Sequence, residues 1–130
     1  MEYIVSKEKM EKYLNLEIND NDLFPSEAPT GTPFYDLQPE NGECYIVTID
    51  HIINLLKSFI NGTIDDNRVK AYVETLIALD LYSFDETTNQ IHDLISNTVF
   101  TLDELKDVNG SIKKEDAEKL LSKILSIVTI

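Results

Sequence analysis

Apolar residues between positions 49 and 77 recur at the spacing of an α-helix. They fall at positions 49, 52, 53, 56, 59 and 60, and again at positions 69, 72, 73, 76 and 77. Both stripes have a period near 3.6 residues, which buries one face of a helix. Thr48 and Asp65 can cap the two helices, and Gly62 can end the first. The short link between them predicts that the two helices pack antiparallel.

The same pattern predicts helices at both ends of the chain. Ser6 can cap an N-terminal helix that ends near Leu16. The last helix carries apolar residues at positions 117, 120, 121, 124, 127 and 128. Glu115 and Asp116 lie in its first turn, where the helix dipole favours negative charge.

The segment from Asp85 to Gly110 has a less regular pattern. A helix can start at Asp85 and place Ile91, Leu94 and Ile95 inward, but the run 98–101 is β-branched or aromatic. The spacing around 101–104 is that of a capping box. We therefore expect the helix to break within 98–101, a new short helix to begin near residue 101, and a turn to form at 109–110.

All four prolines of the chain lie within residues 19–43, which predicts a long loop there. A loop of this length is typical of a functional or poorly ordered segment. The pairs of β-forming residues at 34–35 and 44–47 favour a short β-hairpin near residues 33–47. Cys44 falls within the second apolar run, so we expect a buried, unreactive thiol.

These elements predict a mainly α fold, a single-domain bundle of about five helices. Each apolar stripe is narrower than its helix and must be buried against another helix. The expected parts are an N-terminal helix at 1–18, the Pro-rich loop at 19–45 and a helical core at 46–130. We find no internal repeat in the sequence.

The charge of the chain limits its possible partners. Twenty-four Asp and Glu residues outnumber 11 Lys and Arg residues, which gives a formal net charge of −13. Phosphate groups repel such a surface, so we expect neither nucleic-acid binding nor binding to anionic membranes. A basic protein partner is favoured instead. A single cysteine and no apparent signal peptide or membrane span predict a cytoplasmic protein.

Acidic residues are concentrated in segments that lack lysine and arginine. Neither basic residue type occurs between Lys70 and Lys106. We expect the partner-binding residues in and beside this segment, or on the acidic Pro-rich loop. The candidates are Asp80, Asp85, Glu86, Asp93, Asp103, Glu104 and Asp107. The alternative is that these carboxylates only keep exposed loops soluble.

Motifs for catalysis, cofactors and metals are absent from the sequence. The four glycines lie far apart, and the two histidines have no partner at zinc-ligand spacing. We therefore expect no enzyme activity, no cofactor and no metal site. Residues 105–116 share some spacing with a calcium loop, but Leu105 occupies the first ligand position and Asp116 the last, where glutamate is usual. A degenerate calcium-responsive module remains an alternative.

Two stretches resemble a family of small acidic bacterial helical proteins. Residues 48–62 are similar to the first core helix of that family, and residues 108–112, with 115, 117, 120 and 121, to its last turn and helix. The resemblance extends over about residues 46–128, and Tyr72 stands where the family has tryptophan. It implies an immunity protein that neutralises a toxin, as in contact-dependent growth inhibition. The alternative is a non-enzymatic adaptor or regulatory subunit without a toxin.

Overall fold

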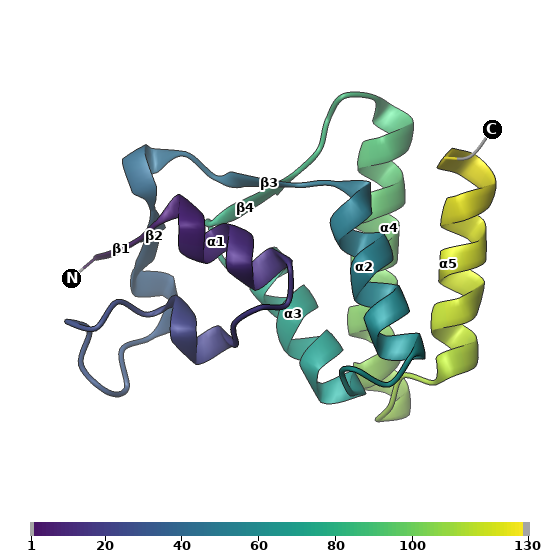
Figure 1. Ribbon diagram of the computed structural model, residues 1–130, viewed down its shortest axis with the longest axis horizontal. Helices are drawn as coiled ribbons and strands as arrows, with labels where there is room; N and C mark the ends of the chain where they lie inside the picture. Colours follow the sequence, from purple (N-terminus) through teal and green to yellow (C-terminus); the bar gives the residue numbers. More distant parts are fainter. Residues whose placement is uncertain (1, 129–130) are drawn as a thin grey trace.

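The computed structural model describes residues 2–128, and in this range the chain forms five α-helices and four short strands (Figure 1). The helices are α1 (Lys7–Leu14), α2 (Ile49–Ile60), α3 (Asp66–Ala78), α4 (Asn89–Asn109) and α5 (Lys114–Val128). The strands are β1 (Tyr3–Val5), β2 (Leu37–Pro39), β3 (Tyr45–Val47) and β4 (Tyr82–Phe84). The prediction of a mainly α fold with five helices is confirmed. The last two residues of the expected 46–130 core lie outside the described range.

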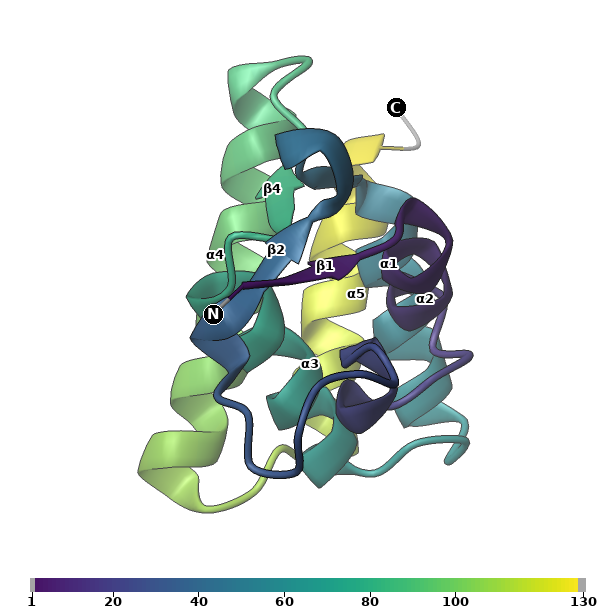
Figure 2. The same cartoon turned by 90° about the vertical axis from the view of Figure 1, so that its left-hand side faces the viewer.

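Helices α2 to α5 form the body of the molecule, and α1 lies at one end beside the strands (Figures 1 and 2). α2 packs chiefly against α5 and also against α4, whereas α3 packs chiefly against α4. The contact between α2 and α3 is minor, so the expected antiparallel pair of these helices is not a main packing unit. Among the described residues, no helix has the length and apolar character needed to cross a membrane.

The four strands form two separate parallel pairs, so the predicted hairpin at 33–47 is wrong. β1 pairs with β2, and β3 pairs with β4. The pairing of β3 with β4 is closed by the hydrogen bond from the Tyr45 amide to the Leu81 carbonyl, 2.8 Å long. Parallel strands need a crossover connection, and here α2 and α3 supply it between β3 and β4. Phe34 and Tyr35, expected in a strand, lie in a short 3-10 helix (Phe34–Asp36).

One strand of each pair has the same three-residue sequence. Both β1 and β3 have the sequence Tyr-Ile-Val, and each is followed by a hydroxyl residue that caps a helix. Ser6 accepts a hydrogen bond from the Lys9 amide at the start of α1. At the start of α2, the Thr48 amide donates to His51 Nδ1. Three shared residues are too few to be noticed in the sequence. They become apparent because both strands pair in parallel and lead into a helix.

Helix α4 runs without a break from Asn89 to Asn109, so the break expected at 98–101 is wrong. Its cap is Thr88, which accepts from the Ile91 amide, and not Asp85. Thr98 is buried, and its hydroxyl donates to the Leu94 carbonyl one turn earlier, at 2.7 Å. Burial of Thr98 and Val99 against neighbouring helices therefore outweighs the weak helix propensity of the run.

Three buried tyrosines fasten α1 to the helical body. The rings of Tyr13 and Tyr72 stack at 5.5 Å, and Tyr82 lies 6.2 Å from Tyr13. Tyr72 donates a hydrogen bond to the Leu14 carbonyl, and Tyr82 donates one to the Met10 carbonyl. Aromatic pairs of this kind stabilise a core beyond the area they bury. α1 is therefore an integral part of the domain.

The Pro-rich segment lies against the body through a few buried side chains. Leu23 and Leu37 are at most 1% exposed, and Pro39 is buried in β2. The segment also contains 3-10 helices at Asp20–Leu23 and Glu40–Gly42. Cys44, expected to be buried, is exposed, and its thiol lies 3.1 Å from the Asp80 carbonyl. Burial alternates along the run 44–47, as in a strand: Cys44 and Ile46 are exposed, whereas Tyr45 is half-buried and Val47 is buried.

Candidate functional site

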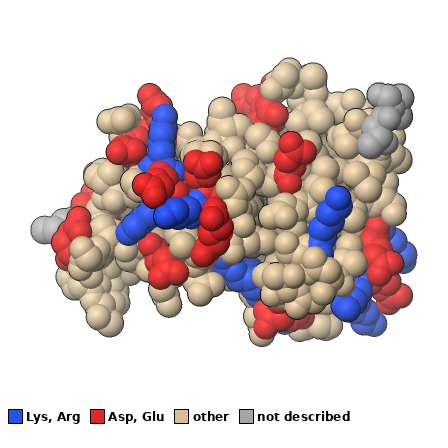
Figure 3. Space-filling model, in the orientation of Figure 1, with Lys and Arg blue, Asp and Glu red and all other residues tan. Residues whose placement is uncertain are grey.

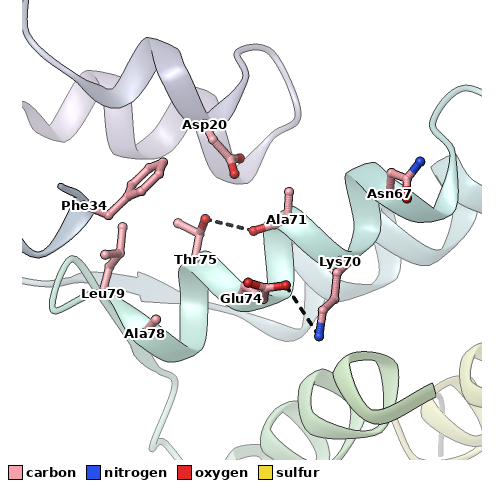
Figure 4. Close-up of a pocket in the computed structure, with 9 residues that line it drawn as sticks. All are labelled: Asp20, Phe34, Asn67, Lys70, Ala71, Glu74, Thr75, Ala78 and Leu79. Atoms are coloured by element: carbon pink, nitrogen blue, oxygen red, sulfur yellow. Dashed lines mark hydrogen bonds and ion pairs between the residues drawn. The ribbon is translucent and has the colours of Figure 1, made fainter. Parts of the chain in front are cut away.

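A hollow on the described surface runs as a groove along the outer side of α3. We call it the α3 groove, and its volume is about 340 Å³. Its floor is α3 itself, where Ala71, Thr75 and Ala78 follow one another at helical spacing (Figure 4). The other lining residues are Asp20, Phe34, Asn67, Lys70, Glu74 and Leu79. Small floor residues let a ligand approach the helix backbone closely.

One wall of the groove comes from the Pro-rich segment. Asp20 and Phe34 lie across the groove from Glu74 and Lys70 (Figure 4). Asp20 is fixed because it accepts hydrogen bonds from the Tyr13 hydroxyl at 2.6 Å and from Arg68 at 3.3 Å. Burial and the bond to Asp20 together raise the pKa of the Tyr13 hydroxyl far above its ordinary value, so Tyr13 stays a donor. This wall is therefore held in place by interactions with α1 and α3.

Lys70 forms the opposite rim and joins α3 to α4. Its ammonium group lies 2.5 Å from Asp103, 2.8 Å from Asp107 and 3.5 Å from Glu74. Desolvation works to lower the pKa of Lys70, but its hydrogen bonds to Asp103 and Asp107 outweigh it and hold the pKa above its ordinary value. Lys70 therefore stays charged, and three carboxylates surround one cation at this seam.

The outer side of α4 continues the surface beyond this seam. We call its exposed stripe the α4 ridge; it consists of Asp93, Asn97, Phe100, Glu104 and Val108. Phe100 is 51% exposed and lies between two carboxylates of the ridge. Beside it is a smaller hollow of about 150 Å³ lined by Thr101, Glu104, Leu105, Val108 and Asn109. An exposed aromatic side chain flanked by polar groups is typical of a binding surface.

The seven residues predicted to bind the partner fall into four places. Asp93 and Glu104 lie on the α4 ridge, and Asp103 and Asp107 lie at the seam on Lys70. Asp80 is exposed just after Leu79, a residue of the α3 groove. The other two candidates precede α4 at its N-terminal end.

Asp85 and Glu86 are separate from the groove and from the middle of the ridge. Asp85 accepts bonds from the Thr87 amide and hydroxyl, at 2.9 and 2.5 Å, and these bonds lower the pKa of the Asp85 carboxyl. Asp85 therefore shapes the turn before α4, and Glu86 is exposed in that turn. Helix geometry puts about 20 Å between the start of α4 and Glu104.

Sequence reasoning missed the aromatic and α3 parts of this surface. Phe34 was assigned to a strand and Phe100 to a helix break, and Glu74 was not singled out. The sequence did offer one indication of the groove. Ala71, Thr75 and Ala78 lie one helical turn apart, and a helix face of such small side chains is not the large apolar stripe that a core requires.

Charges of both signs are mixed on the face of the molecule seen in Figure 1. Figure 3 shows acidic and basic side chains side by side on the face seen in Figure 1, and no single patch of carboxylates covers it. Eight ion pairs among the described residues use six different basic side chains, including Lys7, Lys12 and Lys106. On this face acidic and basic side chains are interleaved, so charge alone does not mark the binding surface.

The segment resembling a calcium loop has a different role in the structure. The Asp107 carboxylate lies on Lys70, and Asp116 accepts a hydrogen bond from the Lys113 amide at the start of α5. Gly110 ends α4 with a left-handed conformation, φ 75°. No group of three or more His, Cys, Asp or Glu side chains within residues 2–128 is arranged to hold a metal ion. These side chains do not converge as calcium ligands must.

Comparisons with protein-family models, with curated proteins and with solved structures find no match to this chain.

Proposed function

We propose that this chain is a binding protein of the immunity type, which neutralises a cognate bacterial toxin by covering a basic surface of the toxin domain. The observation that carries the proposal is the continuous face made by the α3 groove, the Lys70 seam and the α4 ridge. It combines a hollow, an exposed aromatic side chain and an excess of carboxylates. Protein interfaces commonly have an aromatic anchor surrounded by polar groups.

The charge of the chain supports the basic character of the partner. With a net charge of −13, long-range attraction speeds the encounter with a positively charged protein. Many toxins act on nucleic acids, and their active sites are basic for that reason. An acidic protein that covers such a site blocks the substrate without needing a catalytic group of its own.

The proposal is tested in cells that express the toxin encoded beside this gene. The wild-type chain is expected to restore growth and to co-purify with the toxin domain. The double charge reversal D93K/E104K on the α4 ridge is expected to abolish both effects. The matched double variant E115K/E118K on α5 makes the same change of charge away from this face and is expected to protect fully.

Two results would overturn the proposal. Full protection by D93K/E104K would remove the α4 ridge as the binding surface. Failure of the wild-type chain to bind or to neutralise any neighbouring gene product would remove the immunity function and favour an adaptor role. Circular dichroism of both double variants establishes that they are folded before the growth assay is interpreted.

A further inference from the structure

The floor of the α3 groove has room for a side chain from another molecule. Ala71 and Ala78 contribute only methyl groups, and the Thr75 hydroxyl turns back to donate to the Ala71 carbonyl at 2.8 Å. No polar group of the floor is therefore left in need of a partner. The volume of about 340 Å³ is within the range of specific ligand pockets, roughly 300–1,000 Å³.

Phe34 gives the groove an aromatic wall. Its side chain is 37% exposed, so one part of the ring faces solvent. The ring packs against Phe24 with a centroid distance of 4.8 Å and an interplanar angle of 58°. A ring that is exposed but supported from behind can bind a cation on its free face at a small cost in conformational entropy.

The rims of the groove carry more negative than positive charge. Two carboxylates, Asp20 and Glu74, line the groove against the one lining cation Lys70, a local net charge of −1, and Arg68 lies on Asp20 from outside the lining. Both cations are already bonded to these carboxylates. Glu74 is the more available of the two lining carboxylates, because its side chain is 57% exposed against 26% for Asp20 and its ion pair with Lys70 is long, at 3.5 Å.

We propose that the α3 groove receives an arginine side chain from a basic segment of the protein partner. The aliphatic part of the arginine lies over Ala71 and Ala78, and the guanidinium group lies between the Phe34 ring and the rim carboxylates Asp20 and Glu74. Arginine suits this environment better than lysine because its planar group both stacks on aromatic rings and donates several hydrogen bonds in one plane. The inference rests on the proposed function, since it names the chemistry by which the same face recognises its partner.

The experiment uses short peptides, so it does not depend on the identity of the toxin. The probe is an acetylated and amidated eight-residue alanine–leucine peptide that carries two arginines. Its counterparts carry two lysines or two glutamines. Titration is followed by amide chemical shifts in the full chain. The arginine peptide is expected to shift the amides of Ala71, Glu74, Thr75 and Ala78, and to bind more tightly than the lysine peptide.

Three variants test the geometry of the groove. F34L keeps an apolar wall but removes the ring, A78L fills the floor, and E74Q removes a rim charge. Each is expected to weaken binding of the arginine peptide by about fivefold or more, which corresponds to losing a cation–π contact or a charged hydrogen bond. E118Q on α5 makes the same change of charge outside the groove and is expected to leave the dissociation constant within about twofold.

Several results would overturn the inference. Shifts spread over exposed carboxylates of the whole molecule would indicate nonspecific charge attraction. Equal binding of the glutamine peptide, or E74Q behaving like E118Q, would show that no cation is recognised in the groove. The two proposals fail separately. Peptide binding in the groove without protection of toxin-expressing cells would remove only the immunity function, and protection unaffected by F34L and A78L would remove only the arginine site.

Discussion

His51 caps the start of α2 through a hydrogen bond that forms only when its Nδ1 is unprotonated. Nδ1 accepts the hydrogen bond of the Thr48 amide at 2.9 Å, so this nitrogen must be unprotonated. Partial burial lowers the pKa of His51 below its ordinary value of 6.5, although the charges of Asp50 and Glu11 work in the opposite direction. The start of α2 is therefore formed with a neutral imidazole.

The first prediction concerns the pH dependence of stability. As the pH falls below about 6.5, the unfolded chain takes up a proton at His51 before the folded chain does. The contribution of His51 to the free energy of unfolding is therefore complete above about pH 6.5. This contribution is lost as the pH falls through the lower pKa of the folded chain. The variant H51Q keeps an acceptor but does not titrate, so its profile between about pH 7 and pH 5 is expected to be flatter.

Urea denaturation at a series of pH values measures this difference. H92Q removes the other histidine and is expected to keep the slope of the wild-type profile. If H51Q and the wild-type chain lose stability in parallel over this range, the His51 cap does not control it.

Tyr72 provides a second prediction at the scale of one side chain. Its buried hydroxyl donates to the Leu14 carbonyl at 2.8 Å, at the C-terminal end of α1. Y72F keeps the ring stack with Tyr13 but leaves that carbonyl without its donor, and is expected to lower the free energy of unfolding by about 1–2 kcal/mol. Denaturant titration measures the loss. Y35F changes a tyrosine that is 78% exposed, and is expected to have no measurable effect.

At the scale of elements, hydrophobic periodicity was enough to predict α1, α2, α3 and α5. Of the strands, β3 was expected at 44–47 but with the wrong partner, and β1, β2 and β4 could not be found, because each strand has only three residues and a partner far away in the chain. β1 pairs across 34 positions with β2, and neither has a hairpin turn to reveal it. α4 was divided wrongly because burial of Thr98 and Val99, which depends on the tertiary fold, outweighs local propensity.

The candidate site could be predicted only in part for a related reason. Runs of acidic residues indicated the ridge carboxylates Asp93 and Glu104. Their sequence could not show that Asp103 and Asp107 are bound by Lys70, 33 and 37 positions away. Nor could it show that the Pro-rich segment brings Phe34 to the side of α3. Those features arise from contacts between distant elements.

The α4 ridge supports a prediction that separates stability from binding. Phe100 is half exposed, so F100A is expected to change the free energy of unfolding by no more than about 0.5 kcal/mol. If Phe100 is the aromatic anchor of the proposed interface, the same change is expected to weaken binding of the toxin domain by about 2 kcal/mol, or roughly 30-fold. Calorimetric titration with the toxin domain measures the second effect. I46A removes a half-exposed apolar side chain on β3, away from the ridge, and is expected to alter binding little. Equal losses of binding in F100A and I46A would contradict a special role for Phe100.

At the scale of the whole molecule, the charges are distributed unevenly between α5 and the remainder. Residues 113–128 carry four lysines and three carboxylates, whereas the chain as a whole has a net charge of −13. α5 packs on α2, and Figure 2 shows it behind α3, on the far side from the Pro-rich segment that forms the groove wall. The proposed basic partner is therefore expected to approach from the groove side and not from α5, so that long-range attraction orients the encounter before any contact is made.

This orientation predicts how salt affects binding. Raising the ionic strength shortens the distance over which charges act, from about 30 Å at 0.01 M to about 8 Å at 0.15 M. The association rate constant with the basic partner is therefore expected to fall by about 10- to 100-fold over this range, while the dissociation rate constant changes little, because close contacts at Phe100 and the α3 groove are screened less. Stopped-flow mixing measures the first constant and competitor chase the second. If salt instead acts mainly by raising the dissociation rate constant, the salt dependence comes from charge pairs within the interface and not from long-range attraction to this face.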